Sequence, residues 1–257
     1  MRIAYGLVVI LAACGSDSDM LPVGGGSGSG FPDSGTGGTV DGRLIDAKVI
    51  DGSPTAFDAA IFSGRVCLLT DARAFDTCAS TGAAGLTVHL GGNSAVTAAD
   101  GTFKIAAPTT NDVWYVTGSN IVSSYKVKND YFIPAMTRTM FDALKAANTP
   151  GPPGGIVQGE GSVMVHVIRN GIGLSGATAS SALPNDAKYL PFYDNNADQT
   201  DWNQTPSTTG TQGAVWLAGM DVGTTSFTIT PAVGNAITEA AQPVFDQAIT
   251  WDDVIFQ

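Results

Sequence analysis

The sequence predicts an all-β protein built from two tandem β-sandwiches, which are joined by a short helix and a linker. Short apolar or alternating runs separated by turn signals indicate strands. Val, Ile and Thr are frequent, whereas the helix-forming residues Glu, Lys and Leu are scarce. The region from Val40 to Gly234 is nearly twice as long as the roughly 100 residues of one sandwich, which favours two domains.

Four runs in the first half have the length and pattern of strands. They are Gly64 to Thr70, Gly85 to Leu90, Gly101 to Ala106 and Val113 to Gly118. Between two such runs, Asp100-Gly101 predicts a tight hairpin turn, because these residues tolerate positive backbone angles.

The middle of the chain predicts a helix followed by a linker. The span Ala135 to Ala147 places Met136, Met140, Leu144 and Ala147 at helical spacing. The Pro- and Gly-rich stretch from Pro150 to Gly155 then ends the helix and supplies a linker. The C-terminal run VFDQAITWDDVIFQ is predicted to add an edge strand or to pack along the second sandwich.

The N-terminus has the pattern of an export signal. The charged start at Arg2 precedes an apolar stretch, Ile3 to Leu11, which is too short to span a bilayer because a membrane helix needs roughly 20 apolar residues. The following residues, Leu11-Ala12-Ala13-Cys14, resemble the lipobox of bacterial lipoproteins.

This resemblance implies that residues 1–13 are removed and that the Cys14 thiol carries lipid. An ordinary cleaved secretory signal with a chance cysteine is the alternative. Gly15 is not the aspartate that retains many lipoproteins in the inner membrane, so the resemblance implies a lipid anchor in the outer membrane. Residues 14–39 are rich in Gly, Ser, Asp and Pro and predict a flexible tether.

The cysteine count agrees with export. Of the three cysteines, Cys14 is the predicted lipid site, which leaves Cys67 and Cys78 to form a disulfide in an oxidising compartment. The alternative is two free or metal-binding thiols, but no further cysteine and no nearby histidine completes a ligand set.

Charge argues against a nucleic-acid partner. The formal net charge of the whole chain is −11. Removal of residues 1–13 deletes one arginine and no acid, so the mature chain carries 11 − 23 = −12. Such a surface repels nucleic acid and anionic headgroups.

Catalytic signals are missing from the sequence. The two histidines, His89 and His166, lie within strand-like runs and are predicted to be strand residues, not catalytic bases. No nucleophile elbow, zinc-helix motif or Cys/His arrangement is present, so we expect no enzymatic activity and no catalytic residues.

The polar cluster at residues 192–206 is the weak candidate for a binding site. Asp194, Asn196 and Asp198 alternate like the start of a calcium loop, but Gln199 and Thr205 stand where such a loop has glycine and glutamate. We therefore expect no cofactor, with calcium as a weak alternative to an exposed turn. A second weak hypothesis assigns Tyr193 and Trp202 to carbohydrate contact, against burial in a core.

A weak internal repeat supports two similar domains. The segment beginning at Thr97 and that beginning at Thr209 share T-x-x-x-G, followed by apolar residues. GAAGLTV and TAADGTF in the first half resemble motifs of the carboxypeptidase regulatory-like, or transthyretin-like, domains. The resemblance implies two tandem Ig-like or transthyretin-like sandwiches, at residues 40–128 and 159–257, with the helix and linker at 129–158.

These features together predict a non-enzymatic cell-envelope lipoprotein with a structural, spacer or protein-binding role. The expected partners are the membrane, through the lipid, and an envelope protein or glycan. The alternative function is an accessory carbohydrate-binding or adhesion lipoprotein that uses the 192–206 loop.

Overall fold

The computed structural model describes residues 61–81, 83–107, 113–127, 132–148, 158–181, 191–204 and 207–257. Cys14, the predicted signal peptide and the predicted tether lie outside these ranges. Thr55–Gln257 forms one compact unit, to which all the elements below belong. No helix among the described residues is long and apolar enough to cross a membrane.

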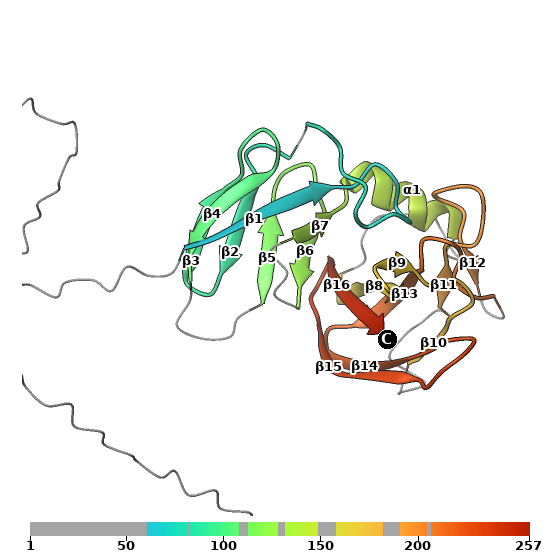
Figure 1. Cartoon of the computed structure of the whole chain (residues 1–257). Coiled ribbons are helices and arrows are strands. Elements are labelled where there is room, and N and C mark those ends of the chain that lie inside the picture. The colour runs from blue at the N-terminus through green and yellow to red at the C-terminus, as the bar shows by residue number, and fades with distance from the viewer. Residues whose placement is uncertain are drawn as a thin grey trace, which may run out of the picture. The chain divides into compact units, whose positions relative to one another are not determined.

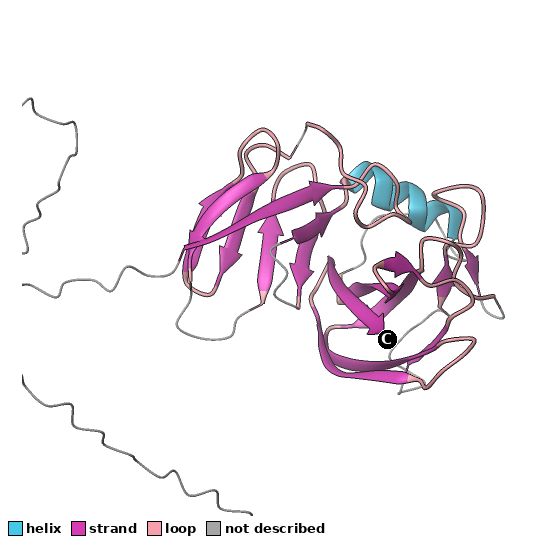
Figure 2. Cartoon of the chain, viewed as in Figure 1, coloured by secondary structure: helices cyan, strands magenta, loops and turns pink. Residues whose placement is uncertain are grey.

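Strands dominate the described chain, as Figure 2 shows. The first half contains β1 (Ile61–Leu68), β2 (Thr87–Leu90), β3 (Asn93–Val96), β4 (Thr102–Ala106), β5 (Trp114–Thr117), β6 (Ser123–Lys126), β7 (Phe132–Ala135) and the helix α1 (Arg138–Asn148). The second half contains β8 (Glu160–Arg169), β9 (Ile172–Gly173), β10 (Thr178–Ser181), β11 (Phe192–Tyr193), β12 (Asn203–Gln204), β13 (Ala214–Asp221), β14 (Gly223–Thr230), β15 (Ile237–Val244) and β16 (Ala248–Phe256). The prediction of an all-β protein is confirmed.

The strands form three sheets (Figure 1). One small sheet has the order β4-β1-β7 and another has the order β10-β14-β15. The large sheet has ten strands in the order β12-β11-β13-β8-β16-β6-β5-β2-β3, with β9 paired to β8. This sheet therefore runs through both halves of the chain, and the division into two sandwiches stays a prediction.

Two of the three hydrophobic cores each belong to one half. The first half packs the β4-β1-β7 sheet against β2 and β5, with Phe103, Trp114 and Ile133 among its buried side chains. The second half packs β8 and β13 against the β10-β14-β15 sheet, where Val165 and Phe227 are fully buried. In each case alternate strand residues point inward, which is the pattern that the sequence predicts.

The third core is shared by both halves. Phe141 and Leu144 of α1 and Phe75 of the loop after β1 pack against Trp216 and Trp251 on the large sheet. Phe75 meets Trp251 edge to face at 4.9 Å between ring centroids. Hydrophobic burial therefore joins the helix and this loop to strands far away in sequence.

The predicted helix is present, but it begins three residues later than expected. Thr137 caps its N-terminus, since the Met140 backbone N–H donates to the Thr137 hydroxyl at 3.1 Å. Met136 is fully buried but precedes the helix, and Phe141 and Leu144 are the buried helical side chains.

The predicted turn before β4 is present, with a difference in pairing. Gly101 has φ +83°, and a Cβ at this position would lie 2.3 Å from the Val66 carbonyl oxygen, so a side chain is excluded. The two arms, β3 and β4, then pair with β2 and β1 in different sheets. The turn thus joins two layers instead of closing a simple hairpin.

The C-terminal segment is not an edge strand, so the first of the two predicted alternatives is wrong, whereas its pairing with β8 agrees with the second. β16 lies inside the large sheet and runs parallel to both β6 and β8. Trp251, Val254 and Phe256 of this strand are buried. Both neighbours come from earlier in the chain, and such pairing leaves no local pattern in the sequence.

Candidate functional site

The predicted disulfide joins the end of β1 to the loop that follows it. Cys67 and Cys78 are bonded, with their Cα atoms 5.0 Å apart. Leu69 also pairs with Cys78 as an isolated bridge, and the Ala79 N–H donates to the Leu68 carbonyl at 2.7 Å. The disulfide prediction is confirmed, and the bond closes a short loop that carries Asp71, Arg73 and Phe75.

Arg73 is oriented within this loop by Asp71. Its Nη2 lies 2.7 Å from Asp71 Oδ2 and its Nε donates to Asp71 Oδ1 at 3.0 Å, which gives a two-point contact. Partial burial acts to raise the pKa of the Asp71 carboxyl, but the hydrogen bonds and charge of Arg73 bring that pKa below its ordinary value. The Asp71 hydrogen bond in turn raises the pKa of Arg73.

The same guanidinium binds the polar loop that the sequence singled out. Arg73 Nη1 donates to the carbonyl of Asn196 at 2.7 Å and to the carbonyl of Ala197 at 2.9 Å. Asp194 and Asp198 add favourable charge interactions with it. An arginine from the first half therefore supplies positive charge to this acidic loop of the second half.

The three calcium candidates are held by other groups in the structure. Asn196 Nδ2 donates to Asp201, and Asp198 Oδ1 accepts from the Thr200 N–H and hydroxyl, both at 2.9 Å. No group of three or more His, Cys, Asp or Glu side chains suited to a metal occurs within the described ranges. The calcium hypothesis gains no support from these contacts, which are those of an Asx-rich turn.

Asp194 has a separate partner, the turn before β13. The residue is 4% exposed, and its carboxylate accepts from the Gly210 N–H at 2.6 Å and the Gln212 N–H at 3.0 Å. Burial raises the pKa of Asp194, and the two backbone hydrogen bonds oppose that rise. This carboxylate thus ties the loop to the start of β13.

The two aromatic residues proposed to contact carbohydrate lie inside the protein. Tyr193 is 1% exposed and its hydroxyl accepts from the Ala179 N–H at 3.0 Å. Trp202 is 3% exposed, donates from Nε1 to the Gln199 carbonyl at 2.9 Å and packs 6.5 Å from Trp216. Neither ring presents an open face, because each fills a hydrophobic core, which was the other alternative.

Helix α1 also holds this loop, through Asn148. Its Oδ1 accepts from the Trp202 N–H at 2.6 Å, while its Nδ2 donates to the carbonyls of Thr200 and Leu144. The loop is therefore held by Arg73 on one side and by the end of α1 on the other.

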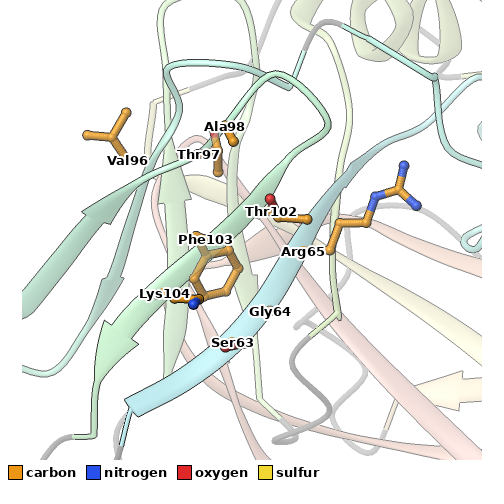
Figure 3. A pocket seen from close by; sticks show the side chains of 9 residues that line it. All are labelled: Ser63, Gly64, Arg65, Val96, Thr97, Ala98, Thr102, Phe103 and Lys104. Atoms are coloured by element: carbon orange, nitrogen blue, oxygen red, sulfur yellow. The ribbon is translucent and has the colours of Figure 1, made fainter. Parts of the chain in front are cut away.

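A polar hollow of about 550 Å³ lies beside the loop and is lined by Arg73, Asp194 and the segment around Thr209. A second hollow of about 730 Å³ lies where β1, β4 and the end of β3 meet (Figure 3). It is lined by Ser63, Gly64, Arg65, Val96, Thr97, Ala98, Thr102, Phe103 and Lys104. Figure 3 shows the Arg65 side chain directed away from Phe103.

Both histidines lie on strands, as expected. His166 on β8 faces Asp253 on β16, with 3.8 Å between Nδ1 and Oδ1, and Lys126 on β6 forms an ion pair with the same carboxylate. Burial lowers the pKa of His166, while the charge of Asp253 partly offsets this. His89 on β2 stacks on Tyr115 at 4.2 Å.

Comparisons with known proteins leave the family open. No family model matches the chain. No curated protein matches it. Among solved structures, the Bacillus anthracis TIE protein is similar at 12% identity with a TM-score of 0.23, over 66% of this chain and 31% of that one. At this TM-score the likeness carries no argument.

Proposed function

We propose that the protein is a non-enzymatic cell-envelope lipoprotein, attached to the outer membrane through Cys14, that holds its β-sandwich modules away from the membrane as a spacer or a protein-binding component. The observation that carries the proposal is the cysteine arrangement. Cys67 and Cys78 are joined in the structure, and the third cysteine is the one in the lipobox-like stretch.

The physical basis of attachment is acyl-chain burial. Each buried methylene contributes about 0.8 kcal/mol, so two or more acyl chains hold a protein on a bilayer stably. The predicted tether of 14–39 has a root-mean-square span of roughly 25 to 30 Å, which allows the folded region to stand off the membrane.

Several features of the folded region support a structural role. The Cys67–Cys78 disulfide closes the loop after β1, and hydrogen bonds from Arg73 and to Asn148 hold the 194–201 loop. The polar groups of the 194–201 loop also bond to one another. Polar groups that bond to one another hold a loop in one conformation, which suits a spacer or a protein-binding component.

The test is fractionation and intact mass of the chain expressed in a bacterium with lipoprotein machinery. We expect a membrane-bound product that starts at acylated Cys14 and contains the Cys67–Cys78 bond. Cys14→Ser is the matched control and should lose both the acyl mass and membrane attachment. A wild-type product that is soluble and unacylated would overturn the proposal, and turnover in a broad hydrolase screen would overturn its non-enzymatic part.

A further inference from the structure

The large sheet has one uncharged face in the first half. In β2, β3, β5 and β6 alternate residues point away from the first core, and these outward residues are partly or fully exposed. They are Thr87, His89, Ser94, Val96, Tyr115, Thr117, Ser123 and Tyr125. None of the eight is an acid, a lysine or an arginine, although the chain as a whole carries −11.

A row of stacked rings crosses this face. The register pairs His89 with Tyr115 and Tyr115 with Tyr125 on neighbouring strands. The ring centroids are 4.2 Å apart in the first pair and 5.3 Å in the second, with interplanar angles of 5° and 21°. Phe245, between β15 and β16, continues the row at 3.6 Å from Tyr125 with an angle of 14°.

The two ends of the row differ. At one end Phe245 covers Tyr125. At the other end, β3 is the last strand of the large sheet, and Ser94 is the residue opposite His89. A serine side chain is too small to cover an imidazole, so the outer face of His89 ends the stack at the sheet edge. Next along β3 on the same face is Val96, which is 64% exposed.

The chemistry around this end suits a neutral sugar. A pyranose ring has an apolar face of C–H groups that packs on an aromatic ring, and hydroxyls at its rim that bond to polar side chains. Ser94 lies opposite His89 on β3, and Thr87 lies two residues along β2 on the same face, so both offer hydroxyls near the imidazole. The negative charge of the chain disfavours anionic polymers, and the face itself has no carboxylate to pair with a cationic one, so its chemistry favours an uncharged polymer.

We propose that this face binds a neutral polysaccharide, with one sugar ring stacked on the outer face of His89 and its hydroxyls bonded to Ser94 and Thr87. The site is distinct from the 192–206 loop, whose aromatic residues are buried. It is also independent of the lipid anchor, so either proposal can fail without the other.

The experiment is native affinity electrophoresis of the full chain in gels that contain one soluble polysaccharide. The neutral probes are dextran, mixed-linkage β-glucan, galactomannan, arabinoxylan and yeast mannan, and dextran sulfate tests for charge-driven retention. We expect at least one neutral probe to retard the protein and dextran sulfate not to retard it.

Two variants place the binding on the proposed face. His89→Thr keeps a strand-compatible residue but removes the ring, and it should weaken retention about tenfold, as expected when one aromatic contact is lost. Ser94→Ile leaves every ring of the row in place, covers the outer face of His89 with a strand-compatible aliphatic side chain and removes the hydroxyl, so it should abolish retention. Ile172→Thr, at a position that is 70% exposed on β9, is the matched control and should bind like the wild type.

Each variant is checked by near-ultraviolet circular dichroism and by its unfolding midpoint. The proposal is overturned if no neutral probe retards the wild type or if dextran sulfate alone does so. It is equally overturned if folded Ser94→Ile and His89→Thr variants are retained as strongly as the wild type. Binding of an envelope protein to this face without any of the polysaccharides would also contradict it.

Discussion

At the scale of single residues, Arg73 connects the two halves of the chain. It contacts Asp71 in its own loop and the carbonyls of Asn196 and Ala197 in the other half. A guanidinium presents several donors in one plane, so one side chain can satisfy a carboxylate and two carbonyls together. The negative charges of Asp194 and Asp198 in this loop favour a nearby positive charge. In the structure the Arg73 guanidinium supplies that charge.

We predict that Arg73→Ala lowers the free energy of unfolding by about 1 to 3 kcal/mol, because the variant loses charge-assisted hydrogen bonds that are partly buried. Chemical denaturation followed by tryptophan fluorescence measures the change. Arg138→Ala removes an exposed arginine on α1 and should change the stability by less than about 0.5 kcal/mol. Equal effects of the two substitutions would show that the Arg73 contacts do not stabilise the fold.

The buried imidazole of His166 is predicted to make the stability of the fold depend on pH. Burial lowers its pKa below the ordinary 6.5, so the unfolded chain gains this proton first as the pH falls. The contribution of His166 to stability is therefore complete above pH 6.5 and is lost as the pH falls through its folded-state pKa. Titration by NMR should give a pKa below 6.5.

The partner carboxylate supplies the control for this titration. Asp253 acts to raise the pKa of His166, so Asp253→Asn should lower it further. An unchanged or higher pKa in that variant would contradict the assigned cause.

At the scale of elements, the loop closed by the Cys67–Cys78 disulfide contacts both halves of the chain. The bond between Cys67 and Cys78 closes the loop that carries Phe75 into the shared core and Arg73 onto the 194–201 segment. Breaking this bond would increase the chain entropy of the unfolded state, and would therefore also destabilise contacts that lie at some distance from the sulfur atoms.

We predict that replacing Cys67 and Cys78 together by alanine lowers the free energy of unfolding by roughly 3 kcal/mol, the value of the chain-entropy model for a loop of this length. In that background Arg73→Ala should cost less than in the wild type, because the loop no longer holds the guanidinium in place. A double-mutant cycle measures the difference. Strict additivity would mean that the disulfide and Arg73 act independently.

At the scale of the whole molecule, β16 and the shared core make the two halves interdependent. β16 pairs with β6 of the first half and with β8 of the second. Trp251 on this strand is 1% exposed and lies in the core that contains residues from both halves. Loss of this strand would remove a central member of the sheet instead of an edge.

We predict that the described halves unfold as one cooperative unit. Amide hydrogen exchange should report the same opening free energy for β5 and β14, and Trp251→Ala should lower both by about 3 to 5 kcal/mol. Ile229→Ala, in the core of the second half, is the matched control and should also lower both if the unit is cooperative. Protection of β5 that is unchanged in both variants would instead indicate two independently folding sandwiches.

The sequence by itself determined what depends on local pattern. The alternating run from Gly101 to Ala106 was predicted as a strand and corresponds to β4, and helical spacing identified α1 apart from its first residues. Three cysteines, one in a lipobox-like stretch, predicted which two are bonded. Each of these inferences concerns residues within about a dozen positions of one another. At that range the spacing along the chain largely determines which side chains can meet.

Only the tertiary structure decided which distant elements meet. It placed β16 between β6 and β8, moved Trp202 and Tyr193 into the cores, brought Arg73 to a loop more than 120 residues away and aligned His89 with Tyr115 and Phe245. The outward residues of β2, β5 and β6 are visible in the sequence as alternation, but their alignment into one row requires the strand order. Strand order follows from the packing of all the cores together, and no short stretch of sequence encodes it.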